Sequence, residues 1–151
     1  MTDLQKTLTA YFGRDHDEID ALLAGVDWTK PKAALLRLAE FDRRLERHIV
    51  WEEGTLFPAV ASVALSLEEG PIAVMKKEHE LIRALKKEAL KALRRGDGAV
   101  AKSRVAEMLD ILGPHNTKEE HILYPLCDRF LPQPAARAIL DKIKAAAGSR
   151  Q

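Results

Sequence analysis

The chain has 151 residues, of which 46% are hydrophobic and 31% are charged; these proportions are typical of a globular protein and exclude a disordered one. A formal net charge of +1 argues against a nucleic-acid partner, and the single cysteine, Cys127, excludes a disulfide framework within the chain. The length suits one domain over residues 1–151. Because the sequence shows no signal-peptide core and no run of about 18 apolar residues, we expect a cytoplasmic protein without a membrane partner.

The first half of the chain predicts two helices. Apolar residues recur at helical spacing from about Asp3 to Ala24, and a turn-rich segment follows them. Pro31 suits the first turn of a second helix, because proline has no N–H to leave unpaired there. The second pattern extends to about Phe57, and Pro58 is expected to disturb it.

The second half predicts two more long helices and a short one. Pro71 opens the third helix, which the turn residues 96–98 end. The fourth extends from about Ala99 to Tyr124, with Gly113-Pro114 expected to kink it or weaken its hydrogen bonding. A last amphipathic segment follows Pro134, and no segment is typical of a strand. The predicted fold class is therefore all-α, an up-down-up-down four-helix bundle with a short C-terminal helix.

The sequence repeats itself. Residues 48–58 read HIVWEEGTLFP and residues 115–125 read HNTKEEHILYP, so both contain His, three residues, a Glu pair and a later aromatic-Pro step. Upstream of each copy, HDEIDAL begins at His16 and HELIRAL begins at His79. Each half is thus a helical hairpin with one His on its first helix and His-x-x-x-Glu on its second, which predicts a pseudo-two-fold bundle.

This spacing indicates a metal site. Side chains four residues apart on an α-helix differ by only about 40° in direction, so the His and Glu of each motif point the same way. In the second hairpin, antiparallel packing brings His79 and His115 level with each other, because both lie about 18 residues from the turn; in the first hairpin the counts are uneven, and the loop of about 7 residues must climb about 12 Å to align His16 with His48, which an extended chain allows. Four imidazoles and two carboxylates suit iron, manganese or zinc, and two carboxylates suit a pair of ions. The predicted ligands are His16, His48, Glu52, His79, His115 and Glu119.

The two motifs resemble the His-His-Glu motifs of the hemerythrin family. RDHDEIDALL is similar to that family's first helix and PIAVMKKEH to the start of its third, so the resemblance covers about residues 10–130. It implies a non-haem centre of two iron ions, with the four histidines as terminal ligands and Glu52 and Glu119 as bridges. It also implies that the protein binds oxygen or nitric oxide in sensing, scavenging or a stress response, and it allows redox activity toward oxygen, peroxide or nitric oxide.

One position departs from the oxygen-carrying members of that family. They place another His one helical turn before the third-helix His, where this chain has Met75. A thioether is a poor ligand for oxidised iron, so we expect an open or water-filled position there, which argues against simple oxygen carriage. A similar module occurs in bacterial proteins linked to nitric-oxide stress, beside a cysteine-bearing piece without counterpart here. The alternative function is iron storage, iron delivery, iron sensing or repair of damaged iron centres.

Neighbouring residues are expected to play lesser parts. His121 should point about 240° away from the motif His that precedes it, off the ligand face. Glu53 and Glu120 should point about 100° from the ligand glutamates and support the site or face solvent. Asp20 is expected to be an exposed acid of the first helix, and Cys127 an inert buried thiol.

Overall fold

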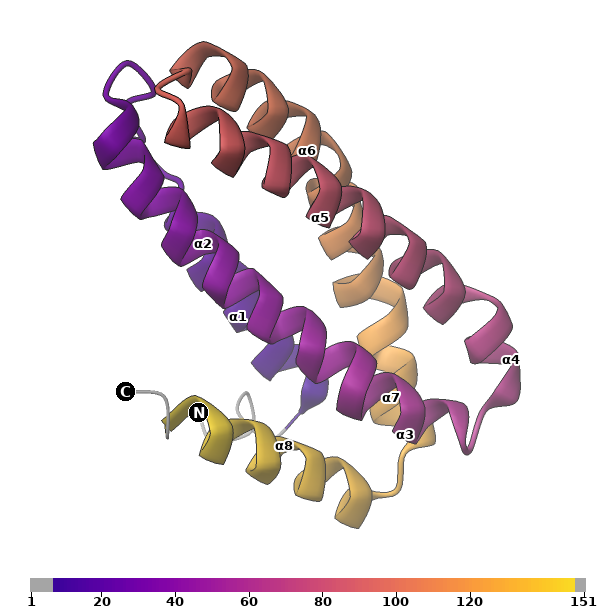
Figure 1. Cartoon of the computed structure of the whole chain (residues 1–151). Coiled ribbons are helices and arrows are strands. Elements are labelled where there is room, and N and C mark those ends of the chain that lie inside the picture. Colours follow the sequence, from indigo (N-terminus) through magenta and orange to yellow (C-terminus); the bar gives the residue numbers. More distant parts are fainter. Residues whose placement is uncertain (1–6, 149–151) are drawn as a thin grey trace.

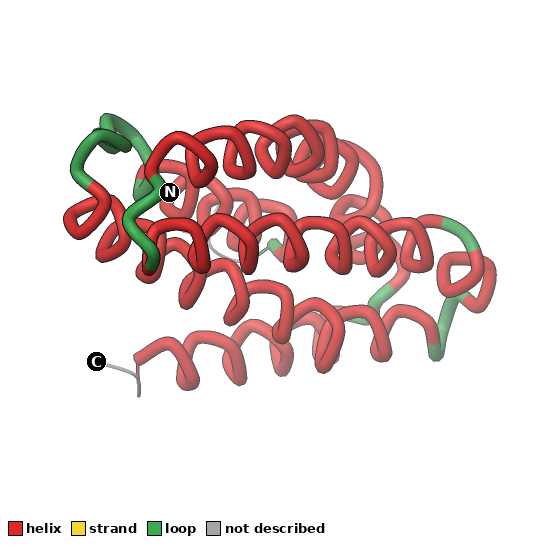
Figure 2. The backbone as a smooth tube through the Cα atoms, turned by 45° about the horizontal axis from the view of Figure 1, so that its top comes forward, coloured by secondary structure: helices red, strands yellow, loops and turns green. Residues whose placement is uncertain are grey.

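Every regular element of the described chain is helical. The computed structural model describes residues 7–148. In chain order its elements are α1 (Leu8–Ala21), α2 (Pro31–Trp51), the π-helical segment η2 (Glu52–Leu56), α3 (Phe57–Ala61), α4 (Leu65–Glu69), α5 (Pro71–Arg94), α6 (Gly98–Lys118), the π-helical segment η3 (Glu119–Leu123), α7 (Tyr124–Phe130) and α8 (Gln133–Gly148). The long helices α1, α2, α5 and α6 alternate in direction, and α8 crosses one end of the bundle (Figures 1 and 2). The predicted four-helix bundle with a C-terminal helix is confirmed.

The start of the first helix is fixed by two caps. The Thr7 hydroxyl accepts the Ala10 N–H at 3.0 Å, and the Asp128 carboxylate accepts the N–H groups of Leu8 and Thr9 at 2.8 and 3.0 Å. These bonds satisfy N–H groups that have no partner within the helix, and Asp128 also ties α7 to α1. Residues 3–6 of the predicted first helix lie outside the described residues.

The prolines of the two motifs do not end their helices. Pro58 was expected to disturb the second helix near Phe57, but the helical path continues through η2 into α3 as far as Ala61. Pro125 follows η3 in the same way, at the start of α7. In both places the proline falls in the first turn after a π-helical segment, where its missing N–H costs little.

The fourth helix has an irregularity that was not predicted, beyond Pro114. The α-helix continues through Pro114, and the change of spacing comes later, at η3. A π-helical turn accommodates one extra residue by closing its hydrogen bonds between residues five apart, and such turns are frequent at functional sites.

Two apolar clusters fill the bundle, and a polar layer lies between them. One cluster, at the α8 end, contains Phe12 and Met75, and the other contains Ile19 and Ile82. On α1 and α5 the residues between these pairs include His16 and His79, both buried. The helices therefore hold the predicted ligands in a layer closed off by apolar side chains on both sides.

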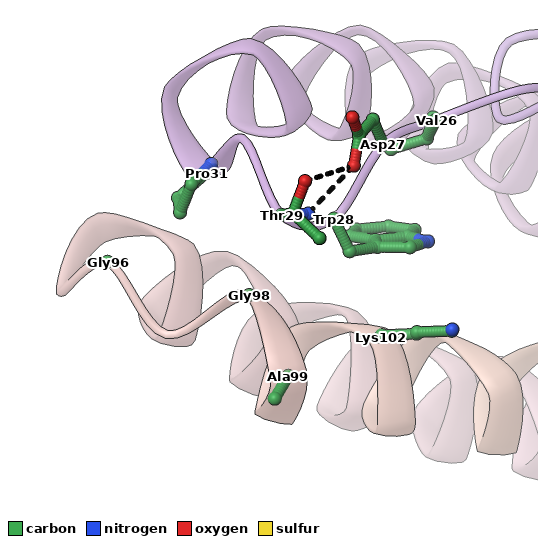
Figure 3. A pocket seen from close by; sticks show the side chains of 9 residues that line it. All are labelled: Val26, Asp27, Trp28, Thr29, Pro31, Gly96, Gly98, Ala99 and Lys102. Carbon is green, nitrogen blue, oxygen red and sulfur yellow. Dashed lines mark hydrogen bonds between the residues drawn. The ribbon is translucent and has the colours of Figure 1, made fainter.

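The end of the bundle away from α8 is closed by a tight backbone contact. A Cβ on Gly98 would lie 1.9 Å from the Trp28 carbonyl oxygen, so only glycine fits there. A surface pocket of about 560 Å³ opens beside this contact, and Figure 3 shows the segment with Trp28 and Thr29 on one side of it and the start of α6, with Ala99 and Lys102, on the other. Its lining includes none of the predicted ligands. Within residues 7–148 no helix combines the length and apolar character needed to cross a bilayer.

Candidate metal centre

The six predicted ligands meet in the polar layer, and each exposes at most 2% of its surface. Their donor atoms form two groups, and within each group the atoms lie within 4.8 Å of one another. The first group is His16, His48, Glu52 and Glu119, and the second is Glu52, His79, His115 and Glu119. The two carboxylates belong to both groups, so the arrangement suits two ions side by side.

Glu52 presents one oxygen to each group. Its Oε2 lies 3.3 Å from His48 Nε2, one helical turn away on the same path, and its Oε1 lies 3.1 Å from His79 Nε2 on α5. The first contact follows from the spacing of four on a helix, whereas the second joins the two halves of the chain.

Glu119 repeats the pattern from the second half. Its Oε2 lies 3.2 Å from His115 Nε2, and its Oε1 lies 3.1 Å from His16 Nε2 on α1. Each carboxylate is therefore positioned to bridge two ions, as the pseudo-two-fold repeat requires.

Every one of the four imidazoles also contacts a carboxylate through its other ring nitrogen. The pairs are His16 Nδ1 with Glu120 at 2.7 Å, His48 Nδ1 with Asp15 at 2.8 Å, His79 Nδ1 with Glu53 at 2.7 Å and His115 Nδ1 with Glu78 at 2.9 Å. Because a carboxylate accepts, Nδ1 donates, and Nε2 is directed to the site in all four rings. Metal-binding histidines are commonly oriented and made more basic in this way.

Neighbouring charges shift the pKa values of the buried groups of the site. Burial alone would lower the pKa of His48, but Glu52 and Asp15 outweigh it and raise that pKa to about 10. The pKa values of His79 and His115 are also raised. Burial alone would lower them, but the nearby carboxylates outweigh it. Burial would raise the pKa of Glu52, yet His48 brings it well below its ordinary value. The carboxylates therefore favour positive charge at His48, His79 and His115.

Three polar atoms of the second group lack hydrogen-bond partners. Glu52 Oε1, His79 Nε2 and Glu119 Oε2 are all buried and make no hydrogen bond, although the first two lie 3.1 Å apart. A buried polar atom left unpaired costs about 1–3 kcal/mol, so three in one place need an explanation. A cation bound by nitrogen and oxygen supplies it, and the residues present fit two such ions.

Comparison with known families agrees with this geometry. Residues 7–127 match the hemerythrin HHE cation binding domain. The chain belongs to this family. Comparison with curated proteins and with solved structures finds no further match.

Four acidic residues accept hydrogen bonds from the imidazoles of this HHE domain, and two of the four were predicted as possible supports of the site. Glu53 and Glu120 were expected to support the site or face solvent, and each accepts a hydrogen bond from an imidazole of the layer. Asp15 and Glu78 do the same but were not predicted. The signal was present, because each of them directly precedes the histidine of its repeat.

The remaining predicted positions agree with the structure of this HHE domain. His121 and Asp20 are exposed. Cys127 is buried, and burial followed by the nearby carboxylates raises the pKa of its thiol to about 12. A thiol with so high a pKa is a poor nucleophile at neutral pH.

Tyr124 is a residue of the site that the sequence pattern did not reveal. Its hydroxyl is fully buried and donates a hydrogen bond to Glu52, and it lies 2.9 Å from Glu119 Oε1. Burial, followed by the charges of Glu119 and Glu52, raises the pKa of this phenol well above 10. The signal in the sequence was the difference between the two repeats, which have Phe57 and Tyr124 at the same position.

Proposed function

We propose that this HHE domain is a non-haem di-iron protein that binds a small diatomic molecule, oxygen or nitric oxide, as an external ligand. The proposed iron ligands are His16, His48, Glu52, His79, His115 and Glu119. Iron held by imidazole and carboxylate supplies redox activity and free coordination positions. The same donors suit manganese or zinc, and the likeness to the hemerythrin family favours iron.

The observation that carries this proposal is the small number of donors in the second group. Two imidazoles and two shared carboxylates are four donors, and Met75 stands one turn before His79 where a further His would add a fifth. Met75 is buried among apolar side chains, and the Phe57 ring stacks on His79 with 6.3 Å between ring centroids. Neither side chain offers a nitrogen or oxygen donor, which supports the proposal that coordination positions of the second ion are left for a diatomic ligand.

The test is metal analysis followed by ligand titration. Protein produced in iron-rich medium should contain about two irons per chain, since the six donors with two shared carboxylates suit a pair of ions. The reduced protein, kept without air, should show a saturable change of its visible spectrum on addition of nitric oxide or oxygen. His121→Ala serves as the control, because that exposed imidazole lies off the layer.

Two outcomes would contradict the proposal. Iron content near zero would remove the centre altogether. Iron that passes rapidly to a chelator with loss of helicity, and without any ligand-dependent spectrum, would favour iron sensing or delivery instead.

A further inference from the structure

We propose that the Tyr124 side-chain oxygen is a seventh protein ligand, used only by the ion that His16 and His48 hold, so that the two metal positions differ chemically. This inference rests on the proposed binding of iron but not on the proposed binding of oxygen or nitric oxide.

The position of the Tyr124 oxygen carries the inference. It lies 3.1 Å from His48 Nε2, 3.2 Å from His16 Nε2 and 2.9 Å from Glu119 Oε1, and it also contacts Glu52 Oε2. The four atoms belong to the four residues of the first group. A hydroxyl donates one proton and accepts at most two, so hydrogen bonds account for at most three of these four contacts at a time, whereas an oxygen near all four donors stands where a fifth ligand of the same ion would stand.

The π-helical segment η3 places the oxygen there. Tyr124 donates its backbone N–H to the Glu119 carbonyl, five residues back. On a continuous α-helix a residue five positions on would point about 140° away from Glu119. The extra residue of the π turn brings both side chains onto one face, and such turns recur at functional sites.

The other half of the chain contains the same device without the oxygen. Phe57 donates its N–H to the Glu52 carbonyl through η2, and its ring stacks on His79 at an interplanar angle of 6°. The two halves therefore differ in the residue that follows the π-helical segment, Phe57 in one and Tyr124 in the other. The position near His16 and His48 has a phenol oxygen, and the equivalent position near His79 has only a ring.

Coordination of this oxygen requires no electron transfer. The phenol O–H bond is replaced by an oxygen–iron bond, and the proton leaves to solvent, because a bound cation favours the anionic oxygen. The first ion then has five protein donors and the second has four. The external ligand is therefore expected at the ion held by His79 and His115.

The experiment compares Tyr124→Phe, which makes the two halves alike, with wild type and with Tyr11→Phe. Tyr11 is the other of the chain's 2 tyrosines, and its ring packs on Trp51 instead of the site. Oxidised, iron-loaded wild type should show a visible phenolate-to-iron charge-transfer band and resonance Raman bands of a bound phenolate. Tyr124→Phe should lose both while keeping about two irons per chain, and Tyr11→Phe should keep both.

A measurement on wild type decides the matter even if Tyr124→Phe fails to bind iron. Incorporation of ring-deuterated tyrosine should shift the phenolate Raman bands. Wild type with two irons and no phenolate bands overturns the inference without touching the proposed function. Phenolate bands in a protein whose spectrum ignores nitric oxide and oxygen support the inference and overturn only the proposed diatomic ligand.

Discussion

Replacement of Glu78 by glutamine tests whether the acids beside the histidines tune the metal site. Glu78 accepts a hydrogen bond from His115 Nδ1 at 2.9 Å and also pairs with Lys118. Glutamine keeps an oxygen of nearly the same reach but removes the negative charge that makes the imidazole basic. Glu80 offers the matched control, because it flanks His79 on the other side and is exposed.

The expected magnitude follows from the loss of one such partner. Removing an outer partner of a metal-binding histidine typically weakens metal binding by about 10–100-fold. Because glutamine still accepts a hydrogen bond, we expect about tenfold, or about 1.4 kcal/mol, for Glu78→Gln. At saturating metal this loss lowers the free energy of unfolding by the same amount, which for a chain of this length is about 3–6 °C in melting temperature.

The assay is a competitive titration of the last-bound metal ion against a chromophoric chelator, with thermal melting of the loaded protein beside it. Glu78→Gln should show the weaker binding, and Glu80→Gln should match wild type. Equal affinities for all three proteins would refute the role assigned to the carboxylate. Equal losses in both variants would mean that general charge, and not the hydrogen bond to His115, sets the affinity.

Three further predictions follow from the same geometry. His115→Ala should lower both the metal content and the melting temperature of the loaded protein, because metal binding is coupled to folding. His121→Ala should change neither; the opposite result would mean that His121, and not His115, lies on the face of the fourth helix that points to the metals. In the metal-free protein the pKa of His48 is about 10 against an ordinary 6.5, so its stabilising contribution is complete below pH 6.5 and disappears as the pH rises to about 10. Denaturant unfolding of metal-free protein across that window should show falling stability, and a flat or rising profile would contradict the assigned charge. Met75→His adds a nitrogen donor one turn before the ligand His, so it should slow the oxidation of the reduced centre in air; equal rates, followed by visible absorption, would show that this position does not face the metals.

The convergence of the six proposed ligands could be predicted because it depends on regular α-helical spacing and on antiparallel packing. His48 and Glu52 lie one turn apart on a regular helix, and the same spacing in the second half made the repeat visible. Buried ligands at matched positions of two amphipathic hairpins then specify both the bundle and the convergence of the six side chains.

The parts that escaped prediction depend on departures from that spacing. Nothing in the letters around Tyr124 distinguishes a π turn from an α turn, and on an α turn its hydroxyl would have faced away from Glu119. Pro114 suggested an irregularity earlier in the helix than the one that exists. Asp15 and Glu78 were not predicted, because each accepts its hydrogen bond from a histidine of the next helix in its hairpin, and that pairing depends on how the helices pack.

The acids after the two shared glutamates have a consequence for how the protein unfolds. Glu53 of the first half holds His79 of the second, and Glu120 of the second half holds His16 of the first. Such reciprocal contacts are the signature of a two-fold homodimer interface, here contained in one chain. Separating the hairpins would break both of these contacts and both proposed metal positions at once, so the two halves should unfold as a single cooperative unit. Two copies of one hairpin could form the same pair of Glu–His contacts with each other.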